Sequence, residues 1–233
     1  LNFDISEANQ DEFLVHVSTS EDFKDAKIYQ TSQSYYSIMN LYRGTRYFWK
    51  VTSLDGLNSS EVGTFITEDI ARFISAGKVQ NIRDIVGGYK TKDGNTIKQG
   101  LAYRGQEVNL EDYVDGSNAN HYQNLDEETI NIFVNDLGIR LDYDLRSESE
   151  LPPYMYSGLG SMVEYVNNDW APAYQYISRD KNNVKLIKPI FESFLTADTK
   201  PVYLHCWGGA DRTGTISFIL GGLLGMSFTD LCL

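Results

Sequence analysis

Cysteine is scarce in this chain: only Cys206 and Cys232 occur among 233 residues, which excludes a fold built on a framework of disulfides. Long hydrophobic runs are also missing. The most apolar stretch, residues 216–224, falls short of the ~18 residues of a membrane-spanning helix, so a buried helix is expected there. No second cluster with the spacing of metal ligands accompanies the adjacent His205 and Cys206, so we expect neither a metal nor another cofactor.

Positive charge is in short supply as well. Lysine and arginine number 20 against 32 aspartates and glutamates, which gives a net charge of −12 at pH 7. Such a chain is a poor partner for nucleic acids or anionic membranes, which attract proteins through positive charge. A phosphorylated substrate is not excluded, because one arginine and a helix N-terminus attract phosphate locally. The hydrophobic fraction of 42% is ample for packed cores and excludes wholesale disorder.

Residues 1–67 have the alternating pattern of short antiparallel strands. Phe13, Val15 and Val17 occupy every second position, and the same period recurs from Tyr47 onward. The stretch Leu-Tyr-Arg-Gly-Thr-Arg-Tyr, which ends at Tyr47, resembles the tyrosine corner of fibronectin type III domains. The resemblance implies a small β-sandwich, here without its opening strand, that serves as a spacer or adhesion module and contacts another protein or a surface.

The rest of the chain has the mixed pattern of an α/β domain. Residues 68–80 are the expected linker, and residues 81–233 are expected to form a central sheet flanked by helices. The sequence therefore predicts a multi-domain protein, with a small all-β sandwich followed by an α/β domain. Its main predicted elements are a helix over 124–138, a strand over 139–145, a helix over 181–195 that Pro189 kinks or breaks, and a strand ending at His205.

The most informative stretch surrounds Cys206. An apolar strand ends at His205-Cys206, a loop with two glycines follows, and an apolar helix begins at about Arg212. The N–H groups and the dipole at a helix N-terminus favour an anion, which here is either the thiolate or a bound phosphate. The planar fork of Arg212 can grip two phosphate oxygens. A lone cysteine after a strand is more often a packing residue, but the complete pattern favours catalysis.

This pattern, His-Cys-x5-Arg-Thr-Gly, resembles the signature of the cysteine-based phosphatases. Two further blocks resemble a bacterial tyrosine phosphatase family: Asn-Ile-Arg-Asp followed by Gly-Gly-Tyr at 81–89, and Gly-Ile to Asp-Leu-Arg and Glu at 138–150. The resemblance covers residues 78–233. Related domains continue with more helices, so this domain is expected to be truncated at its C-terminus.

The resemblance implies a role for each residue of the loop. Cys206 would attack phosphorus to form a phosphocysteine intermediate, which water then hydrolyses. Thr213 would hydrogen-bond the thiolate, and His205 would orient the loop. From its position at the end of a strand, Asp144 either holds the guanidinium of Arg212 or is a surface carboxylate. The phosphate oxygens would be bound by the backbone amides of Trp207, Gly208, Gly209, Ala210, Asp211 and Arg212 and by the Arg212 side chain.

A departing oxygen needs a proton, and two aspartates are candidates for the general acid. Asp211 lies within the loop, and the resembling family uses the loop aspartate in this way. Asp169 lies in a Trp- and Pro-containing stretch like the mobile acid loop of other tyrosine phosphatases. Asp211 is the favoured acid, with Asp169 as the alternative.

Ala210 departs from the family pattern, which has lysine before the loop aspartate. Such a lysine would add a second cation for multiply charged substrates. Its absence favours a phosphotyrosine protein or peptide, or a small phosphomonoester, as the substrate. An inositol-phosphate or phosphoinositide phosphatase is the alternative enzyme, and a phosphate-binding module without catalysis is the alternative of another class.

The start of the chain and its few cysteines bear on the cellular compartment of the protein. The chain begins at Leu1 with neither an initiator Met nor a signal peptide, which suggests a trimmed N-terminus. With few cysteines and an adhesion-type module in front, a secreted or cell-envelope bacterial protein is expected, and the cytoplasm is the alternative.

Overall fold

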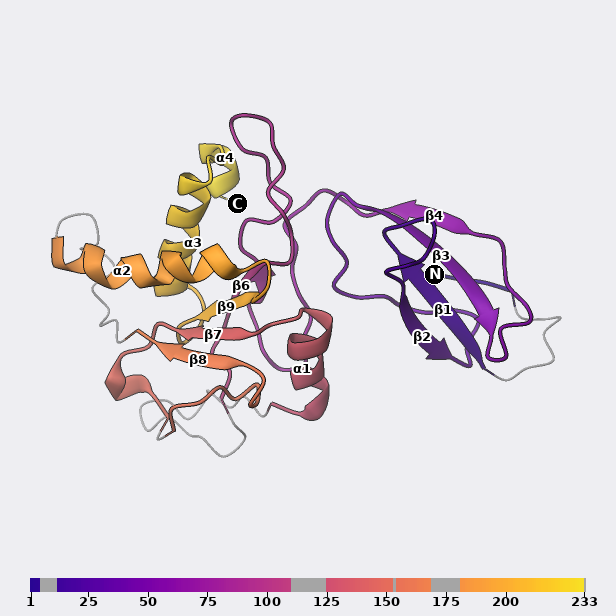
Figure 1. Cartoon of the computed structure of the whole chain (residues 1–233), viewed down its shortest axis with the longest axis horizontal. Helices are drawn as coiled ribbons and strands as arrows, with labels where there is room; N and C mark the ends of the chain where they lie inside the picture. The colour runs from indigo at the N-terminus through magenta and orange to yellow at the C-terminus, as the bar shows by residue number, and fades with distance from the viewer. Residues whose placement is uncertain (5–11, 110–124, 153, 169–180, 233) are drawn as a thin grey trace. The chain divides into compact units, whose positions relative to one another are not determined.

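The computed structural model describes residues 1–4, 12–109, 125–152, 154–168 and 181–232, except the side chains of residues 181–184 and 186. The chain divides into two compact units, Leu1–Ile70 and Ala71–Leu233. In Figure 1 the first unit carries strands β1 to β4, and the second carries all the helices and the remaining strands.

The first unit is built on one antiparallel sheet with the strand order β2-β1-β3-β4. The predicted alternation is present, since Phe13, Val15 and Val17 are buried together with Tyr47 and Val51. The strands are β1 (Phe13–Ser18), β2 (Lys27–Thr31), β3 (Arg46–Ser53) and β4 (Gly63–Ile66).

The described part of this unit does not contain the second sheet of the predicted sandwich. Beyond the four strands, residues 1–4 and 12–70 add isolated bridges such as that between Asn2 and Tyr35. Alternation in a strand reveals that one face is buried, but it does not tell what covers that face. The Oη of Tyr47 accepts a hydrogen bond from the backbone N–H of Tyr42 at 2.9 Å.

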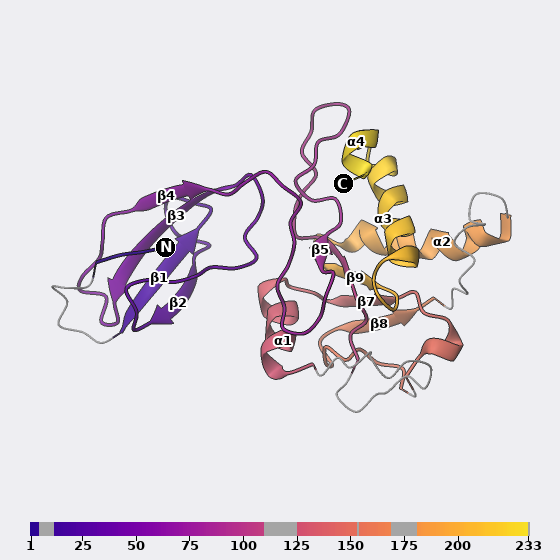
Figure 2. The same cartoon turned by 180° about the vertical axis from the view of Figure 1, so that it is seen from behind.

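The second unit is built on a five-stranded sheet with the order β5-β6-β9-β7-β8. Strands β6, β9, β7 and β8 are parallel, and β5 pairs antiparallel with β6 at the edge (Figure 2). Gly105, His205, Asp144 and Asn167 pair in register, so the carboxyl ends of four parallel strands meet along one line. The strands are β5 (Arg83–Asp84), β6 (Ala102–Gly105), β7 (Leu141–Asp144), β8 (Glu164–Asn167) and β9 (Val202–His205).

Helices cover both faces of this sheet, as expected for a central sheet flanked by helices. Successive residues of β9 alternate between two cores: Tyr203 packs with Phe133 on one face, and Leu204 packs with Ile190 and Ile216 on the other. The helices are α1 (Glu127–Asn131) with the π-helical η1 (Ile132–Asp136), the 3-10 turn η2 (Glu148–Glu150), α2 (Lys181–Ser193) with the 3-10 turn η4 (Phe194–Thr196), α3 (Asp211–Leu223) and α4 (Phe228–Leu231).

The structure corrects two expectations that the sequence raised for this unit. Pro189 does not end its helix, because α2 runs on to Ser193. The predicted linker, residues 68–80, is only partly a connection: the two units divide after Ile70, and Ile74, Ala76 and Val79 are buried in the core beneath η1. These three apolar side chains remove their surface from water in the second unit, which fixes the segment to it.

Candidate active site

Cys206 directly follows β9 and is 3% exposed. Residues 207–210 form a loop, and α3 begins at Asp211. The strand, loop and helix therefore occur as predicted, with the thiol at the carboxyl edge of the sheet, where α/β folds bind their ligands.

The loop turns its carbonyl groups toward the protein. Four successive carbonyl oxygens accept hydrogen bonds from groups behind the loop. In a trans peptide the N–H points opposite to the C=O, so the N–H groups of residues 207–210 face the other side. This arrangement forms a cradle of donors for an anion. The bonds run from His205 Nδ1 to Cys206 O (3.0 Å), Glu107 N to Trp207 O (2.9 Å), Asn81 Nδ2 to Gly208 O (3.0 Å) and Arg104 Nη2 to Gly209 O (2.6 Å).

Gly209 is the loop position that only glycine fits. Its φ is +69°, in the left-handed region that side chains avoid. A Cβ there would also collide with the backbone carbonyl of Gly105 at the end of β6. The glycine thus lets the loop lie directly against the neighbouring strand.

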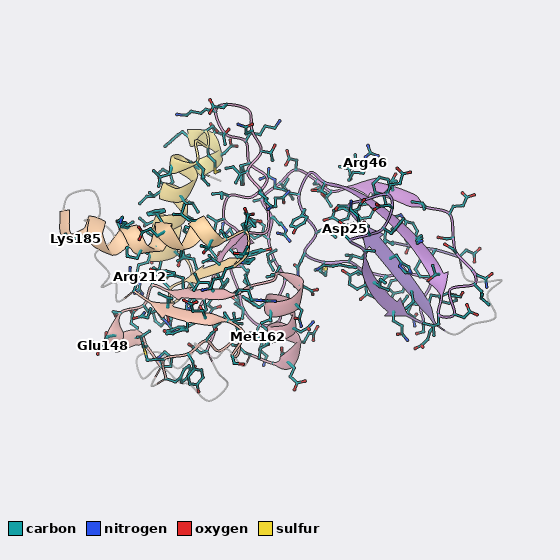
Figure 3. All side chains as sticks on the ribbon, in the orientation of Figure 1. Asp25, Arg46, Glu148, Met162, Lys185 and Arg212 are labelled. Atoms are coloured by element: carbon teal, nitrogen blue, oxygen red, sulfur yellow. The ribbon has the colours of Figure 1, made fainter. Side chains whose placement is uncertain are left out.

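Arg212, the second residue of α3, is 7% exposed and is held by Glu150. Its Nη1 donates to Glu150 Oε2 and its Nη2 to Glu150 Oε1, both at 2.7 Å, and Nη1 also donates to Leu145 O at 3.1 Å. Such a bidentate pair fixes the guanidinium plane. In Figure 3 Arg212 lies within the body of the second unit, whereas Glu148, two residues before Glu150, lies at its edge.

Electrostatics of this pair favours the charged forms. Burial raises the pKa of Glu150, but its hydrogen bonds with Arg212 and Ser147 outweigh this and lower the pKa to about 2. Burial lowers the pKa of Arg212, and the bonds to Glu150 reverse this and raise it. Both side chains are therefore ionised at neutral pH.

Asp144 was predicted to hold Arg212, but among the described residues the hydrogen bonds of Arg212 go to Glu150 and Leu145, and Asp144 contributes only through its charge, which helps to raise the pKa of Arg212. The Asp144 carboxylate is occupied by Arg146, which donates to it through Nε at 3.0 Å and Nη2 at 2.6 Å, and by Tyr165 Oη at 2.9 Å. Asp144 ends β7 in register with His205, so Arg146 folds back onto it. The loop arginine is reached instead by Glu150, from the turn η2.

His205 is fully buried between two carboxylates. Its Nε2 lies 2.9 Å from Asp142 Oδ1, and its Nδ1 lies 3.8 Å from Asp144 Oδ1. Burial lowers the pKa of the imidazole, but the charges of Asp144 and Asp142 overcome this and raise it to about 9. An imidazolium therefore lies next to Cys206 at neutral pH, and it donates to the Cys206 carbonyl.

A comparison of the sequence with known protein families matches the part of the chain that contains this loop. The sequence profile described as "Tyrosine phosphatase family" matches residues 74–232, well over half of the chain. The chain belongs to the tyrosine phosphatase family. It is thus a member of the cysteine-based phosphatase superfamily, and phosphorylated compounds are its class of substrate.

One solved structure similar to this tyrosine phosphatase family member is the core catalytic domain of the PP-IP phosphatase SIW14 from S. cerevisiae, in complex with citrate. The match has 16% sequence identity and a TM-score of 0.43, and it covers 67% of this chain and 74% of that chain. Among the curated proteins no match was found.

Neither a membrane-spanning helix nor a metal site occurs among the described residues. None of their helices is both long and apolar enough to cross a membrane. They also contain no group of three or more His, Cys, Asp or Glu side chains placed to hold a metal ion.

Other predicted residues of this tyrosine phosphatase family member lie as follows. Thr213 is fully buried, and its Oγ1 has no hydrogen-bond partner within the described part of the chain. Asp211 is exposed at the start of α3, and Ala210 before it is exposed too. Asp169 lies outside the described residues, so the structure does not compare the two candidate acids.

Buried charges that the sequence did not predict support the loop. Arg146, 1% exposed, joins Asp144 to Glu107 at 2.6 Å and to Asn109 at 3.1 Å. Asp142 adds its contact with His205 and accepts from Ser157 Oγ at 2.7 Å. A signal was present: two aspartates lie in a strand that is otherwise apolar and buried. Charges there need partners, because an unpaired buried charge is costly.

Proposed function

We propose that the second unit is a cysteine-dependent phosphatase that hydrolyses phosphotyrosine or a similar phosphomonoester. The observation that carries the proposal is the loop from Cys206 to Arg212. Its carbonyls are bound from behind, its N–H groups face the opposite side, and its arginine is held as a fork by Glu150. This arrangement suits an oxyanion with three equatorial oxygens next to a thiolate.

The proposed chemistry has two balanced steps. The Cys206 thiolate attacks phosphorus, an S–P bond forms, and the P–O ester bond breaks with its electron pair going to the leaving oxygen, which takes a proton from an acid. Water then attacks phosphorus and gives a proton back to the carboxylate of the acid, the S–P bond breaks with its electron pair on sulfur, and phosphate and the thiolate are released. The buried hydroxyl of Thr213 is a donor suited to stabilise that departing thiolate.

Two positioning residues support these steps. Glu150 holds Arg212 in its fork, and His205 holds the start of the loop through its hydrogen bond to the Cys206 carbonyl.

Turnover of p-nitrophenyl phosphate tests the proposal. We expect hydrolysis by the full chain and at least a ~10^4-fold loss in Cys206→Ser, since the nucleophile is removed. Cys232→Ser is the matched control, because it removes the other, exposed thiol, and it should keep full activity. Tight phosphopeptide binding without turnover would replace the enzyme with a phosphate-binding module.

The general acid is assigned to Asp211, with Asp169 as the alternative. Removing the acid slows the hydrolysis of a substrate with a poor leaving group more than that of a substrate with a good one. Phenoxide is the poorer leaving group, so its departure depends more on a proton than that of p-nitrophenoxide does. The true acid is therefore the aspartate whose change to Asn reduces phenyl phosphate hydrolysis far more than p-nitrophenyl phosphate hydrolysis. A selective loss in Asp169→Asn alone would overturn the assignment to Asp211.

Substrate preference is assigned from Ala210. This exposed position lacks the side-chain cation that the resembling phosphatases place there, so a singly phosphorylated group is favoured over an inositol polyphosphate. A substrate panel should show a higher kcat/KM for a phosphotyrosine peptide than for inositol polyphosphates. Ala210→Lys should reduce the ratio of these two kcat/KM values. The reverse order in the unchanged protein would make it an inositol-phosphate phosphatase.

We also propose that the first unit is a fibronectin type III-like module that acts as a spacer or adhesion element. Two features support this. Tyr47 bonds the backbone of Tyr42 upstream, as a tyrosine corner does, and β1, β3 and β4 are neighbours like strands C, F and G of such sandwiches.

A further inference from the structure

A small cavity lies behind the loop, between β5, β6 and the first turns of α3. Its volume is about 150 Å³. Two arginines line it, Arg83 from β5 and Arg104 from β6, and Gly214 and Ser217 of α3 line it from the other side. The cavity is separate from the N–H cradle, because Arg104 binds the loop through its carbonyls, on the face opposite to that cradle.

The two arginines are placed against each other. Arg83 and Arg104 are direct partners in the antiparallel pairing of β5 with β6, where like charges destabilise a sheet. Among the described residues, no salt bridge uses either of them. The Nε of each is buried and has no hydrogen-bond partner in that part of the chain.

Carboxylates do not balance this charge within the cavity. Asp84 lines it but is paired with Arg72 and accepts from the N–H groups of Gly87 and Gly100. Asp230 also lines it and accepts from Ser227. Two arginines therefore line a cavity with one carboxylate, Asp230, that forms no salt bridge among the described residues, and the Arg83 guanidinium also lies 5.4 Å from the centre of the Phe73 ring.

From this geometry we infer a second anion site: the cavity binds one oxyanion of phosphate size between Arg83 and Arg104. A planar guanidinium is suited to bind such a group with two N–H donors, and the cavity volume admits a single phosphate group. The site does not contain Cys206, so it stands even if the proposed hydrolysis fails.

An anion there would act on the loop from behind. Arg104 donates to Gly209 O at 2.6 Å and to Ala210 O at 3.3 Å. Arg83 donates to Asn81 Oδ1 at 2.6 Å, and Asn81 Nδ2 donates to Gly208 O at 3.0 Å. Three consecutive carbonyls of the loop are thus tied to the arginine pair, so occupancy of the cavity would change how firmly the loop is held.

The test counts phosphate sites while the loop is blocked. In a Cys232→Ser background, iodoacetate carboxymethylates Cys206 and leaves a carboxylate in the loop. Calorimetric titration with inorganic phosphate should then show one remaining site. Arg83→Gln should weaken that site at least tenfold. Lys92→Gln, which removes the same charge from an exposed loop position, should leave it unchanged.

Misfolding of Arg83→Gln would also abolish phosphate binding, so a second variant is chosen that is expected to bind phosphate more tightly. Asp230→Asn removes the opposing carboxylate and keeps an acceptor for Ser227, so phosphate should bind two- to fivefold more tightly. Phenylphosphonate, titrated in parallel, separates free phosphate from a phosphate group on a larger molecule, and binding of either supports the site. The inference is overturned if the blocked protein binds neither anion, or if Arg83→Gln and Lys92→Gln bind phosphate equally. If Cys206 is not alkylated, the titration is made on the unmodified protein, which should bind two phosphates. Arg83→Gln should then bind only one, and two sites in Arg83→Gln would also overturn the inference.

Discussion

Three cations surround the loop, and they differ in what they face. His205 and Arg212 each face a carboxylate, and the pKa of each is raised although burial opposes it. Among the described residues Arg104 is hydrogen-bonded by carbonyls and by no carboxylate, and burial and then Arg83 lower its pKa to about 10. Burial acts in the same direction on all three, so the partner decides the sign of the shift. A carboxylate partner therefore stabilises the charged form of a buried cation, and the second anion site is proposed where the described residues show none.

Changing Arg212 should have the largest effect. Arg212→Lys keeps the charge but removes the fork that binds Glu150 and, as proposed, the phosphate oxygens. We expect kcat/KM for p-nitrophenyl phosphate to fall by about 10^3-fold. Arg140→Lys, an arginine that bonds carbonyls away from the loop, is the control and should stay within twofold. A loss below tenfold in Arg212→Lys would remove it from the proposed site.

His205 gives a pH dependence of stability. Its pKa is about 9 in the fold and 6.5 in the unfolded chain, so its contribution is complete below pH 6.5 and is lost as the pH rises through 9. That contribution amounts to about 3 kcal/mol. Urea unfolding at pH 6.5 and 9.5 should show this loss in the unchanged protein and not in His205→Gln. Equal pH slopes for the two proteins would mean that the imidazole is neutral in the fold.

Glu150→Gln makes Arg212 resemble Arg104, because it removes the carboxylate charge that faces the guanidinium and keeps neutral acceptors such as Leu145 O. We expect kcat/KM to fall by roughly tenfold, chiefly in kcat, since a less firmly held fork fits the transition state less well. Glu148→Gln, on the same turn but exposed, is the matched control. A defect confined to thermal stability would assign Glu150 a structural role only.

Removing the first unit should have the smallest effect. None of the three cations and none of their carboxylate partners lies in Leu1–Ile70. The chain from Ala71 onward should therefore hydrolyse p-nitrophenyl phosphate within twofold of the full chain. A larger loss would show that the first unit contributes to the site.

Much of the second unit could be predicted from local patterns. The strand expected over 139–145 is β7, and the helix expected from about Arg212 is α3, because periodicity depends only on neighbouring residues. Contacts between distant segments could not be predicted in this way. Ile74, Ala76 and Val79 looked like a linker, since three scattered apolar residues do not reveal the core that covers them.

By itself the sequence determined the composition of the loop: a cysteine after a strand, two glycines, and an arginine at the start of a helix. These features follow from residues close together in the chain. Only the tertiary structure decided which carboxylate meets which cation. Glu150, not Asp144, meets Arg212, 62 residues away, and Arg83 meets Arg104 without a carboxylate between them. The reason is that pairing depends on strand register and on the direction of each side chain, and both are set when the sheet assembles.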